Sequence, residues 1–231
     1  GPTASGKSAL ALDLAERLKN EGRKGVIVNA DSAQVYADLQ VLSARPSADE
    51  MAQAEHRLYG AWDGSQACSA AQWAEAAKRE IADIHAHGDV PILVGGTGLY
   101  IRTLMEGIAP VPAIPADVRD AVRALPTPDA FAELATADPA SHARLDPGDT
   151  QRIARALEVV RATGLTLGEW QQRKEGGIAD RVALIQGMAT GELLLLVALL
   201  NVDDRGPKRA TLERMEGLGR RRQSGGKNNN E

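Results

Sequence analysis

GPTASGKS, residues 1–8, is the stretch that decides the fold of this 231-residue chain. It matches G-x-x-x-x-G-K-[ST], the pattern of a phosphate-binding loop, in which backbone N–H groups turn inward around a phosphate chain. The lysine of the pattern reaches the phosphates, and its final hydroxyl reaches a magnesium ion. The sequence therefore predicts a diphosphate or triphosphate site formed by Gly1, Pro2, Thr3, Ala4, Ser5, Gly6, Lys7 and Ser8.

A helix is predicted to follow this loop directly, as the pattern requires. Leu10, Leu14 and Leu18 repeat every four residues in ALALDLAERLKN, which is the spacing of one helix face. The N-terminus of such a helix favours an anion, so a phosphate site is better supported than a glycine-rich turn that matches by chance. Because the strand that feeds such a loop would precede Gly1, we expect the sequence to be a fragment of a longer chain.

The composition is that of an ordinary globular protein. With 43% hydrophobic and 25% charged residues, the chain can bury a core for one domain, or for one domain plus an insert. The single cysteine, Cys68, excludes an internal disulfide and favours a reducing compartment, the cytoplasm. The longest apolar run, residues 193–200, is far shorter than the ~20 residues of a membrane helix, so no membrane partner is expected. The net charge of −4 argues only weakly against nucleic acid, because phosphate contacts depend on local basic patches.

Two further strands are predicted to end in polar residues beside the loop. The strand at 26–28 leads to Asp31 and Ser32, and the strand at 90–94 leads through glycines to Thr97. Ligands of open parallel sheets lie beyond the carboxyl ends of the strands, so these residues are expected to share one site. A carboxylate there can hold magnesium or accept a proton. Alternatively, Asp31 or Ser32 caps a short helix that follows, and the two roles are compatible.

The rest of the chain is predicted to be mainly helical. Ser69 begins a long helix that stops at Gly88, and a strand is expected at 57–62. We predict an α/β fold of the P-loop NTPase type, a parallel sheet flanked by helices, with an all-helical insert or second lobe. The predicted segments are a P-loop core at 1–110, a helical insert at 111–178 and a C-terminal segment at 179–231.

One helix of the insert carries a basic cluster. In the helix predicted from GDTQRIARALEVVRATG, the residues Ile153, Leu157 and Val160 form the buried stripe. Arginines spaced three residues apart can bind successive phosphates of a nucleic-acid backbone, or they can form a solvated face. The polar residues beside the stripe are Gln151, Arg152 and Arg155.

Six motifs together resemble the tRNA dimethylallyltransferases (tRNA isopentenyltransferases) of bacteria. They occur in the order GPTASGKS, NADSAQVY at 29–36, ARPS at 44–47, HRLYG, LVGGTGLY at 93–100 and DTQRIARALEV at 149–159. The resemblance covers residues 1–178, and the joint pattern is highly specific even though the phosphate loop alone is not.

The resemblance implies transfer of a five-carbon prenyl group from dimethylallyl diphosphate to N6 of adenosine 37 in a tRNA anticodon stem-loop. Pyrophosphate would leave with the help of Mg²⁺, and a monomer is expected. Lys7, Asp31 and Thr97 would be the catalytic residues, with Asp31 taking the N6 proton and Thr97 near the diphosphate. Ser8 would bind the metal. The residues that would face tRNA are Ser32, Gln34, Gln151, Arg152 and Arg155.

After Asp180 the sequence departs from the family pattern. Its final residues are rich in glycine, arginine and asparagine, a composition typical of disorder. Two other functions stay open from the residues alone. A small-molecule or nucleotide kinase uses the same loop with ATP, and an inactive fragment or paralogue of the transferase would bind without turnover.

Overall fold

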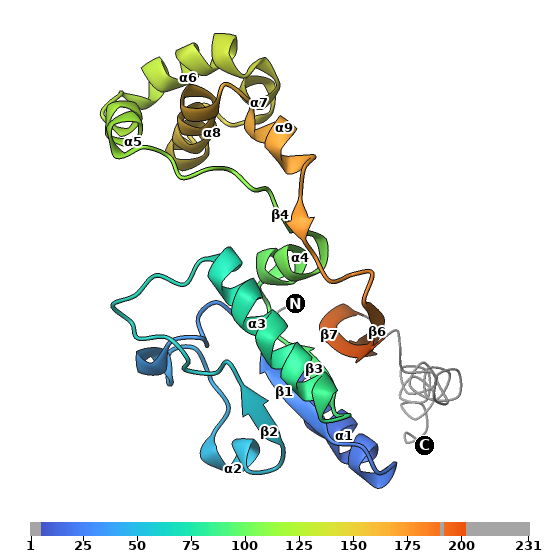
Figure 1. Ribbon diagram of the computed structural model, residues 1–231. Helices are drawn as coiled ribbons and strands as arrows, with labels where there is room; N and C mark the ends of the chain where they lie inside the picture. The colour runs from blue at the N-terminus through green and yellow to red at the C-terminus, as the bar shows by residue number, and fades with distance from the viewer. Residues whose placement is uncertain (1–5, 190–191, 202–231) are drawn as a thin grey trace, which may run out of the picture. The chain divides into compact units, whose positions relative to one another are not determined.

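A computed structural model describes residues 6–189 and 192–201 of the chain. The chain divides into two compact units (Figure 1). The core unit contains the described residues up to Glu106 and from Gly177 onward, and the helical unit is Gly107–Gly176. The predictions for residues 1–5 of the phosphate loop and for the tail at 202–231 lie outside the described residues.

The core unit is built on a mixed five-stranded sheet with the order β2-β1-β3-β7-β6. Strand β1 is parallel to both of its neighbours, β2 and β3, with Ile27 opposite Ile92, whereas β7 pairs antiparallel with β3 and β6 pairs antiparallel with β7. The predicted α/β fold with a parallel sheet is confirmed for this three-stranded part. The strands are β1 (Gly25–Asn29), β2 (Glu55–Arg57), β3 (Val90–Val94), β6 (Val182–Ala189) and β7 (Glu192–Asn201).

Helices cover both faces of this sheet. Helix α1 (Lys7–Asn20) packs its buried leucines, Leu14 and Leu18, against Ile27 and Ile92 on one face. On the other face, α3 (Ala70–Ala86) and α4 (Gly98–Glu106) pack against Val28 and Leu93. The alternation follows from the two-residue period of a strand, which directs successive side chains to opposite faces. The course of these helices can be followed in Figure 1.

Helix α3 confirms the predicted start and stop signals. The Ser69 hydroxyl accepts the backbone N–H of Gln72, and the Gln72 side chain accepts the N–H of Ser69, which completes a capping box. Gly88 takes a left-handed φ of 76° just after the helix ends. Trp73 is fully buried, stacks on Tyr100 with ring centroids 4.6 Å apart, and belongs to the core as predicted.

The second strand of the sheet differs from its prediction. A strand was expected at 57–62, but β2 is Glu55–Arg57 and the chain turns immediately afterwards. Leu58 and Gly60 have positive φ values of 61° and 59°, a conformation that cannot continue a strand. Two short helical segments flank the loop at residues 40–46. They are η1 (Ala37–Leu39) and α2 (Ala48–Met51), and α2 is capped by Ser47.

The C-terminal segment predicted from residue 179 contributes two strands to the core unit. β7 pairs with β3, and β6 pairs with β7. Strand β6 was not predicted from the sequence. Among the described residues, no helix is long and apolar enough to cross a membrane.

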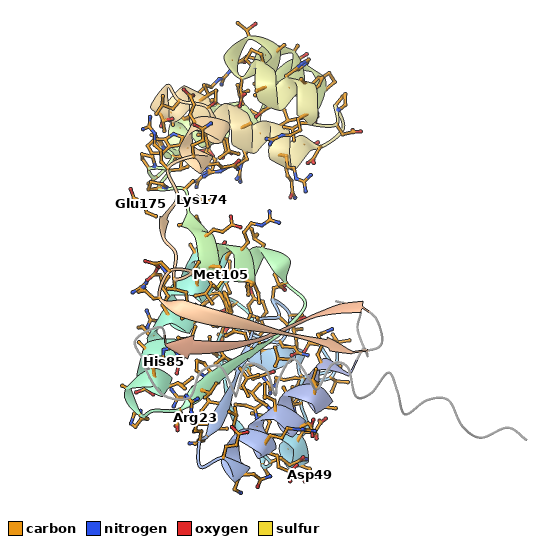
Figure 2. The ribbon with its side chains drawn as sticks, turned by 90° about the vertical axis from the view of Figure 1, so that its right-hand side faces the viewer. Arg23, Asp49, His85, Met105, Lys174 and Glu175 are labelled. Atoms are coloured by element: carbon orange, nitrogen blue, oxygen red, sulfur yellow. The ribbon has the colours of Figure 1, made fainter. Side chains whose placement is uncertain are left out.

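The helical unit consists of five helices and a short two-stranded ladder. Its apolar core includes Leu134 from α6 and Ile153 and Leu157 from α8. Val160, the third residue of the buried stripe predicted for that helix, is only partly buried and packs against this core. Figure 2 labels Lys174 and Glu175 at the end of this unit, where Glu175 begins β5. The elements are β4 (Gly107–Ile108), α5 (Ala116–Arg123), α6 (Thr127–Ala137), α7 (Pro139–Arg144), α8 (Thr150–Thr163), α9 (Leu167–Gln171) and β5 (Glu175–Gly176).

Candidate active site

A close backbone contact joins the carboxyl ends of β1 and β3. The Ala30 N–H donates to the Val94 carbonyl at 2.8 Å, and the Thr97 N–H donates to the Ala30 carbonyl at 3.2 Å. A Cβ atom on Gly95 would lie 2.1 Å from the carbonyl carbon of Ala30, so only glycine leaves room for this crossing. The crossing brings Asp31 and Thr97, from distant parts of the sequence, to one edge of the sheet.

Asn29 holds the backbone of Asp31 in place. Its fully buried side chain accepts the Asp31 N–H at 2.9 Å and donates to the Asp31 carbonyl at 3.1 Å. The same amide donates to the Leu58 carbonyl at 3.1 Å, which ties β1 to the turn after β2. A buried polar group must find partners of this kind. This role of Asn29 was not predicted, although an asparagine at the end of an apolar strand is a usable signal.

The Asp31 carboxylate is half-buried, with one oxygen engaged. Oδ1 accepts the backbone N–H of Ala33 at 2.9 Å and, more weakly, that of Gln34 at 3.4 Å. Oδ2 accepts no hydrogen bond from the described residues. Asp31 therefore caps the turn that follows, as one alternative suggested, and keeps an oxygen available. The short helix expected after it is replaced by a turn at residues 32–35 and by η1.

The hydroxyl groups of Thr97 and Ser32 lie together beside Asp31. The Ser32 N–H donates to Thr97 Oγ1 at 2.9 Å, and the Thr97 hydroxyl donates to Ser32 Oγ at 3.1 Å. Ser32 is exposed and Thr97 is half-buried, so both hydroxyls border solvent. The structure thus brings three predicted site residues into one cluster, whose roles stay predictions.

Gln34 has a different environment from the one its predicted role suggests. Its amide nitrogen donates to the carbonyls of Ser43 at 2.9 Å and Ala44 at 3.2 Å. The side chain therefore anchors the loop that carries Val41 and Leu42, which are 90% and 88% exposed. Its Oε1 accepts no hydrogen bond from the part of the chain that the structure describes.

The described end of the phosphate loop has the expected local geometry. Gly6 takes a left-handed φ of 78° immediately before α1, which begins at Lys7. Lys7 is half-buried and Ser8 is exposed at the first turn of the helix. Backbone N–H groups at such a position, together with the helix dipole, favour a phosphate. The other predicted loop residues, Gly1 to Ser5, lie outside the described residues.

The donor set suits a metal that is bound mainly through its substrate. Within residues 6–189 and 192–201, no group of three or more His, Cys, Asp or Glu side chains could hold a metal ion. Mg²⁺ commonly uses one or two protein oxygens, several waters and the oxygens of a substrate phosphate. The exposed Ser8 hydroxyl is a ligand of this type, so the residues present fit such an ion.

The negative charge of Asp31 contributes to raised pKa values at two tyrosines, Tyr59 and Tyr100. Burial raises the pKa of Tyr59 well above its usual range, and the negative charge of Asp31 adds to the effect. Burial also raises the pKa of Tyr100, with contributions from Cys68, Tyr36 and Asp31. Both hydroxyls therefore stay protonated at neutral pH.

The predicted RNA-facing residues lie on the exposed side of α8 in the helical unit. Gln151 is exposed, and Arg152 is 77% exposed with a guanidinium nitrogen 3.4 Å from Asp149. Arg155 is 45% exposed and lies 3.8 Å from Glu158. These residues flank the buried stripe as predicted, whereas Asp31, Ser32 and Thr97 belong to the core unit.

Comparison with known proteins identifies the family. The sequence model of IPP transferase matches residues 34–198. A tRNA dimethylallyltransferase of Erythrobacter litoralis is 64% identical over 184 residues, which cover 80% of this chain and 58% of that relative. The corresponding enzyme of Sphingopyxis alaskensis is 66% identical over 184 residues, covering 80% and 59%.

A solved structure agrees with this assignment. The structure of a eukaryotic dimethylallyltransferase acting on tRNA matches with a TM-score of 0.65 and 26% identity, covering 76% of this chain and 43% of that one. The chain thus has the P-loop NTPase-like fold of these proteins, and it spans less than three fifths of the length of the two curated relatives described above. Because the match to the family model extends over more than half of the sequence, the chain belongs to the IPP transferase family.

Proposed function

We propose that this protein transfers the dimethylallyl group of dimethylallyl diphosphate to N6 of adenosine 37 in the anticodon stem-loop of tRNA, releasing pyrophosphate. The observation that carries the proposal is the cluster at the ends of β1 and β3. There the open oxygen of Asp31 lies beside the hydroxyls of Ser32 and Thr97, in a chain of the IPP transferase family.

Asp31 is the proposed general base. An exocyclic adenine amine is a poor nucleophile because its lone pair is delocalised into the ring, so a carboxylate that accepts its proton assists attack. Oδ1 is occupied by the N–H of Ala33, and Oδ2 is the oxygen proposed to receive the proton. Asn29 fixes the backbone on both sides of this carboxylate, which reduces the reorganisation needed during the reaction.

The adenine must leave its stack to reach this cluster. Enzymes that modify a base swing the nucleotide out and read its edge with hydrogen bonds. Ser32 and Gln34 are proposed to contact the extruded base. For Gln34 the contact is through Oε1, because its amide nitrogen is bound to the carbonyls of Ser43 and Ala44.

The leaving group is proposed to bind at the start of α1. Lys7 and the N–H groups of the loop would hold the diphosphate, and the helix dipole favours its charge. Mg²⁺, bound by Ser8 and phosphate oxygens, would neutralise the charge that develops as the C–O bond breaks. Thr97 is proposed to orient the diphosphate from the side of β3.

The basic face of α8 is proposed to contact the RNA backbone through Gln151, Arg152 and Arg155. Arginine binds phosphate oxygens through a planar fork of N–H groups, and such contacts position an RNA without reading its sequence. A monomer in the bacterial cytoplasm completes the proposal, and the half-buried free thiol of Cys68 fits a reducing compartment.

Ligand-dependent unfolding distinguishes this function from a kinase. A ligand that binds only the folded state at a hundredfold excess over its Kd stabilises the protein by about 2.7 kcal/mol. We expect dimethylallyl diphosphate with Mg²⁺ to raise the melting temperature and ATP with Mg²⁺ to have a smaller effect. Stabilisation by ATP with Mg²⁺ but not by dimethylallyl diphosphate would favour the kinase. Binding of the prenyl donor with no pyrophosphate released in the presence of a stem-loop RNA would favour an inactive relative.

A further inference from the structure

The helical unit contains a pocket of about 550 Å³ between α5, the start of α6 and α8. This volume lies in the range of about 300–1,000 Å³ that is usual for small-molecule sites. Its apolar lining includes Val122, Ala130 and Ile153, which are all buried. The polar residues that line it are Arg123, Thr127, Thr150, Gln151, Arg155 and Glu158.

The buried side chain of Glu158 lies close to both arginines of this pocket. Its side chain is 3% exposed, with Arg123 Nε 2.9 Å from Oε1 and Arg155 Nη1 3.8 Å from Oε2. The arginines come from different helices, α5 and α8, and their side chains are 64% and 45% exposed. Burying a carboxylate is unfavourable unless it has partners of this kind.

The charge of the pocket is positive. Of the described residues that line it, two are arginines and one is an acid, so one guanidinium charge is left without compensation inside the pocket. Arg123 donates a hydrogen bond to Glu158 through Nε. The terminal nitrogens of that guanidinium, at an exposed side chain, are the part that can meet a phosphate.

The rim also offers hydroxyl and amide groups. The hydroxyls of Thr127 and Thr150 are 2.9 Å apart and form a bridge between α6 and α8. Gln151, next in the chain, is exposed. Such groups can bond to a ribose 2′-hydroxyl or to the edge of an unpaired base, which are the features by which proteins recognise RNA.

We propose that this pocket binds one unpaired nucleotide of the RNA substrate, with its phosphate on Arg123 and Arg155 and its nucleoside over the apolar lining. This inference rests on the proposed function, because it takes RNA as the substrate. It adds Arg123 as an RNA-binding residue and Glu158 as the positioning residue that sets both guanidinium groups. A cationic rim above an apolar floor matches a nucleotide, which combines an anion with a flat apolar ring, better than a free anion.

The first test measures RNA binding of the full chain by fluorescence anisotropy. An RNA hairpin with an unpaired loop is compared with a blunt RNA duplex of the same length. Arg123→Gln should weaken hairpin binding by about 3- to 10-fold and lower the slope of log K against log salt by about 0.7, the value for one lost contact to a single strand. Arg144→Gln is the matched control, because Arg144 is an exposed arginine on α7 of the same unit.

The second test uses the sign of the charge effect at Glu158. Glu158→Gln removes a negative charge, so attraction by net charge alone predicts tighter RNA binding. If Glu158 acts by positioning the two arginines, Glu158→Gln should instead weaken RNA binding by about threefold or more, because the arginines are no longer held. Glu133→Gln is the control, since Glu133 pairs with Arg161 outside the pocket. Thermal unfolding checks the fold, and if Glu158→Gln is unfolded, Glu158→Asp, which retracts the carboxylate, replaces it with the same expectation.

The third test concerns the nucleoside. Ala154→Leu fills part of the pocket floor and should reduce the preference for the hairpin over the duplex. If the wild-type chain binds neither RNA, the proposed function fails. If it binds the hairpin but Arg123→Gln leaves affinity and salt slope unchanged, or Glu158→Gln tightens binding, the pocket inference alone is overturned. An unchanged hairpin preference in Ala154→Leu likewise overturns the placement of the nucleoside.

Discussion

Replacing Gly95 with alanine should disrupt the candidate site, because the added methyl group would overlap the backbone of Ala30 and Asp31. A Cβ atom at this position would lie 2.1 Å from the carbonyl carbon and 2.2 Å from the carbonyl oxygen of Ala30, and 2.7 Å from the Asp31 nitrogen. All three are backbone atoms, so no side-chain rotation relieves the overlap. The chain at Ala30 must retreat by about 1.3 Å, the difference between 2.1 Å and the 3.4 Å at which ordinary contact begins.

This retreat has a cost that can be worked out from the structure. Two hydrogen bonds depend on the crossing, Thr97 N–H to the Ala30 carbonyl and Ser32 N–H to Thr97 Oγ1. Each contributes about 1 kcal/mol, and forcing an extra methyl group into a packed site costs about 1–3 kcal/mol. We therefore expect Gly95→Ala to lower the free energy of unfolding by about 3–5 kcal/mol. A shift of about 1 Å at the proposed catalytic residues Asp31 and Thr97 should also slow turnover by about 10²-fold.

Gly98→Ala is the matched control for this experiment. Gly98 begins α4 in the same glycine-rich stretch, and a Cβ atom there would meet nothing within 4 Å. Alanine at this position should be neutral or stabilise by up to about 1 kcal/mol, because it reduces the freedom of the unfolded chain. Urea unfolding of the two variants gives the comparison. Equal stability of Gly95→Ala and wild type would refute the argument that the backbone crossing builds the site.

Four further predictions follow from the contacts of single residues. Lys7→Ala should weaken binding of dimethylallyl diphosphate by about 10- to 100-fold in calorimetry, the scale of one charge-assisted hydrogen bond, and unchanged affinity would remove the loop from the site. Asp31→Asn should keep donor affinity and slow prenyl transfer by about 10²-fold or more, whereas loss of metal binding with normal single-turnover chemistry would make Asp31 a metal ligand. Arg152→Ala should lower the salt slope of RNA binding by about 0.7–0.9, and an unchanged slope would assign Arg152 to a solvated face. Arg57 holds the pKa of Asp83 below its usual 3.8 through a hydrogen bond, so this carboxylate stabilises the fold above that pH and the contribution is lost as the pH falls through the lowered pKa. Arg57→Ala should therefore be less stable than wild type at neutral pH, and the difference in unfolding free energy should shrink as the pH is lowered in a series of urea unfolding curves. A difference that does not depend on pH would contradict the pairing.

The parts of the fold that could be predicted are those where local pattern and tertiary environment agree. β1 and β3 are short apolar runs flanked by glycine or polar residues, and both are buried on two faces, which such runs require. Ser69 and Gln72 stand at capping-box spacing, so the start of α3 was readable from the sequence.

The missed features depend on contacts between distant residues or on unusual backbone angles. β2 ends at Arg57 because Leu58 takes a positive φ, which no propensity of leucine suggests. Helix α7 has only six residues, too few for a helical repeat to stand out.

The site shows the same division. Asp31 and Thr97 were predicted to lie close together because each follows a strand of one parallel sheet. The hydrogen bond from Asn29 to Leu58 and the pairing of Glu158 with Arg123 join residues that no local pattern relates. The spatial relation of Glu158 to α5 arises only when α8 packs against it. Side chains that position others are therefore harder to find from one sequence than the groups they position.

The most direct test of the central claim is mass analysis of nucleosides after reaction. An anticodon stem-loop RNA with adenosine at position 37 is incubated with dimethylallyl diphosphate, Mg²⁺ and the wild-type chain, in parallel with Asp31→Asn. The account predicts one adenosine that carries a five-carbon group at N6 with the wild-type chain, and about 10²-fold less of it with the variant. Prenylated adenosine formed equally by both proteins, or phosphorylated product formed from ATP in place of it, would contradict the account.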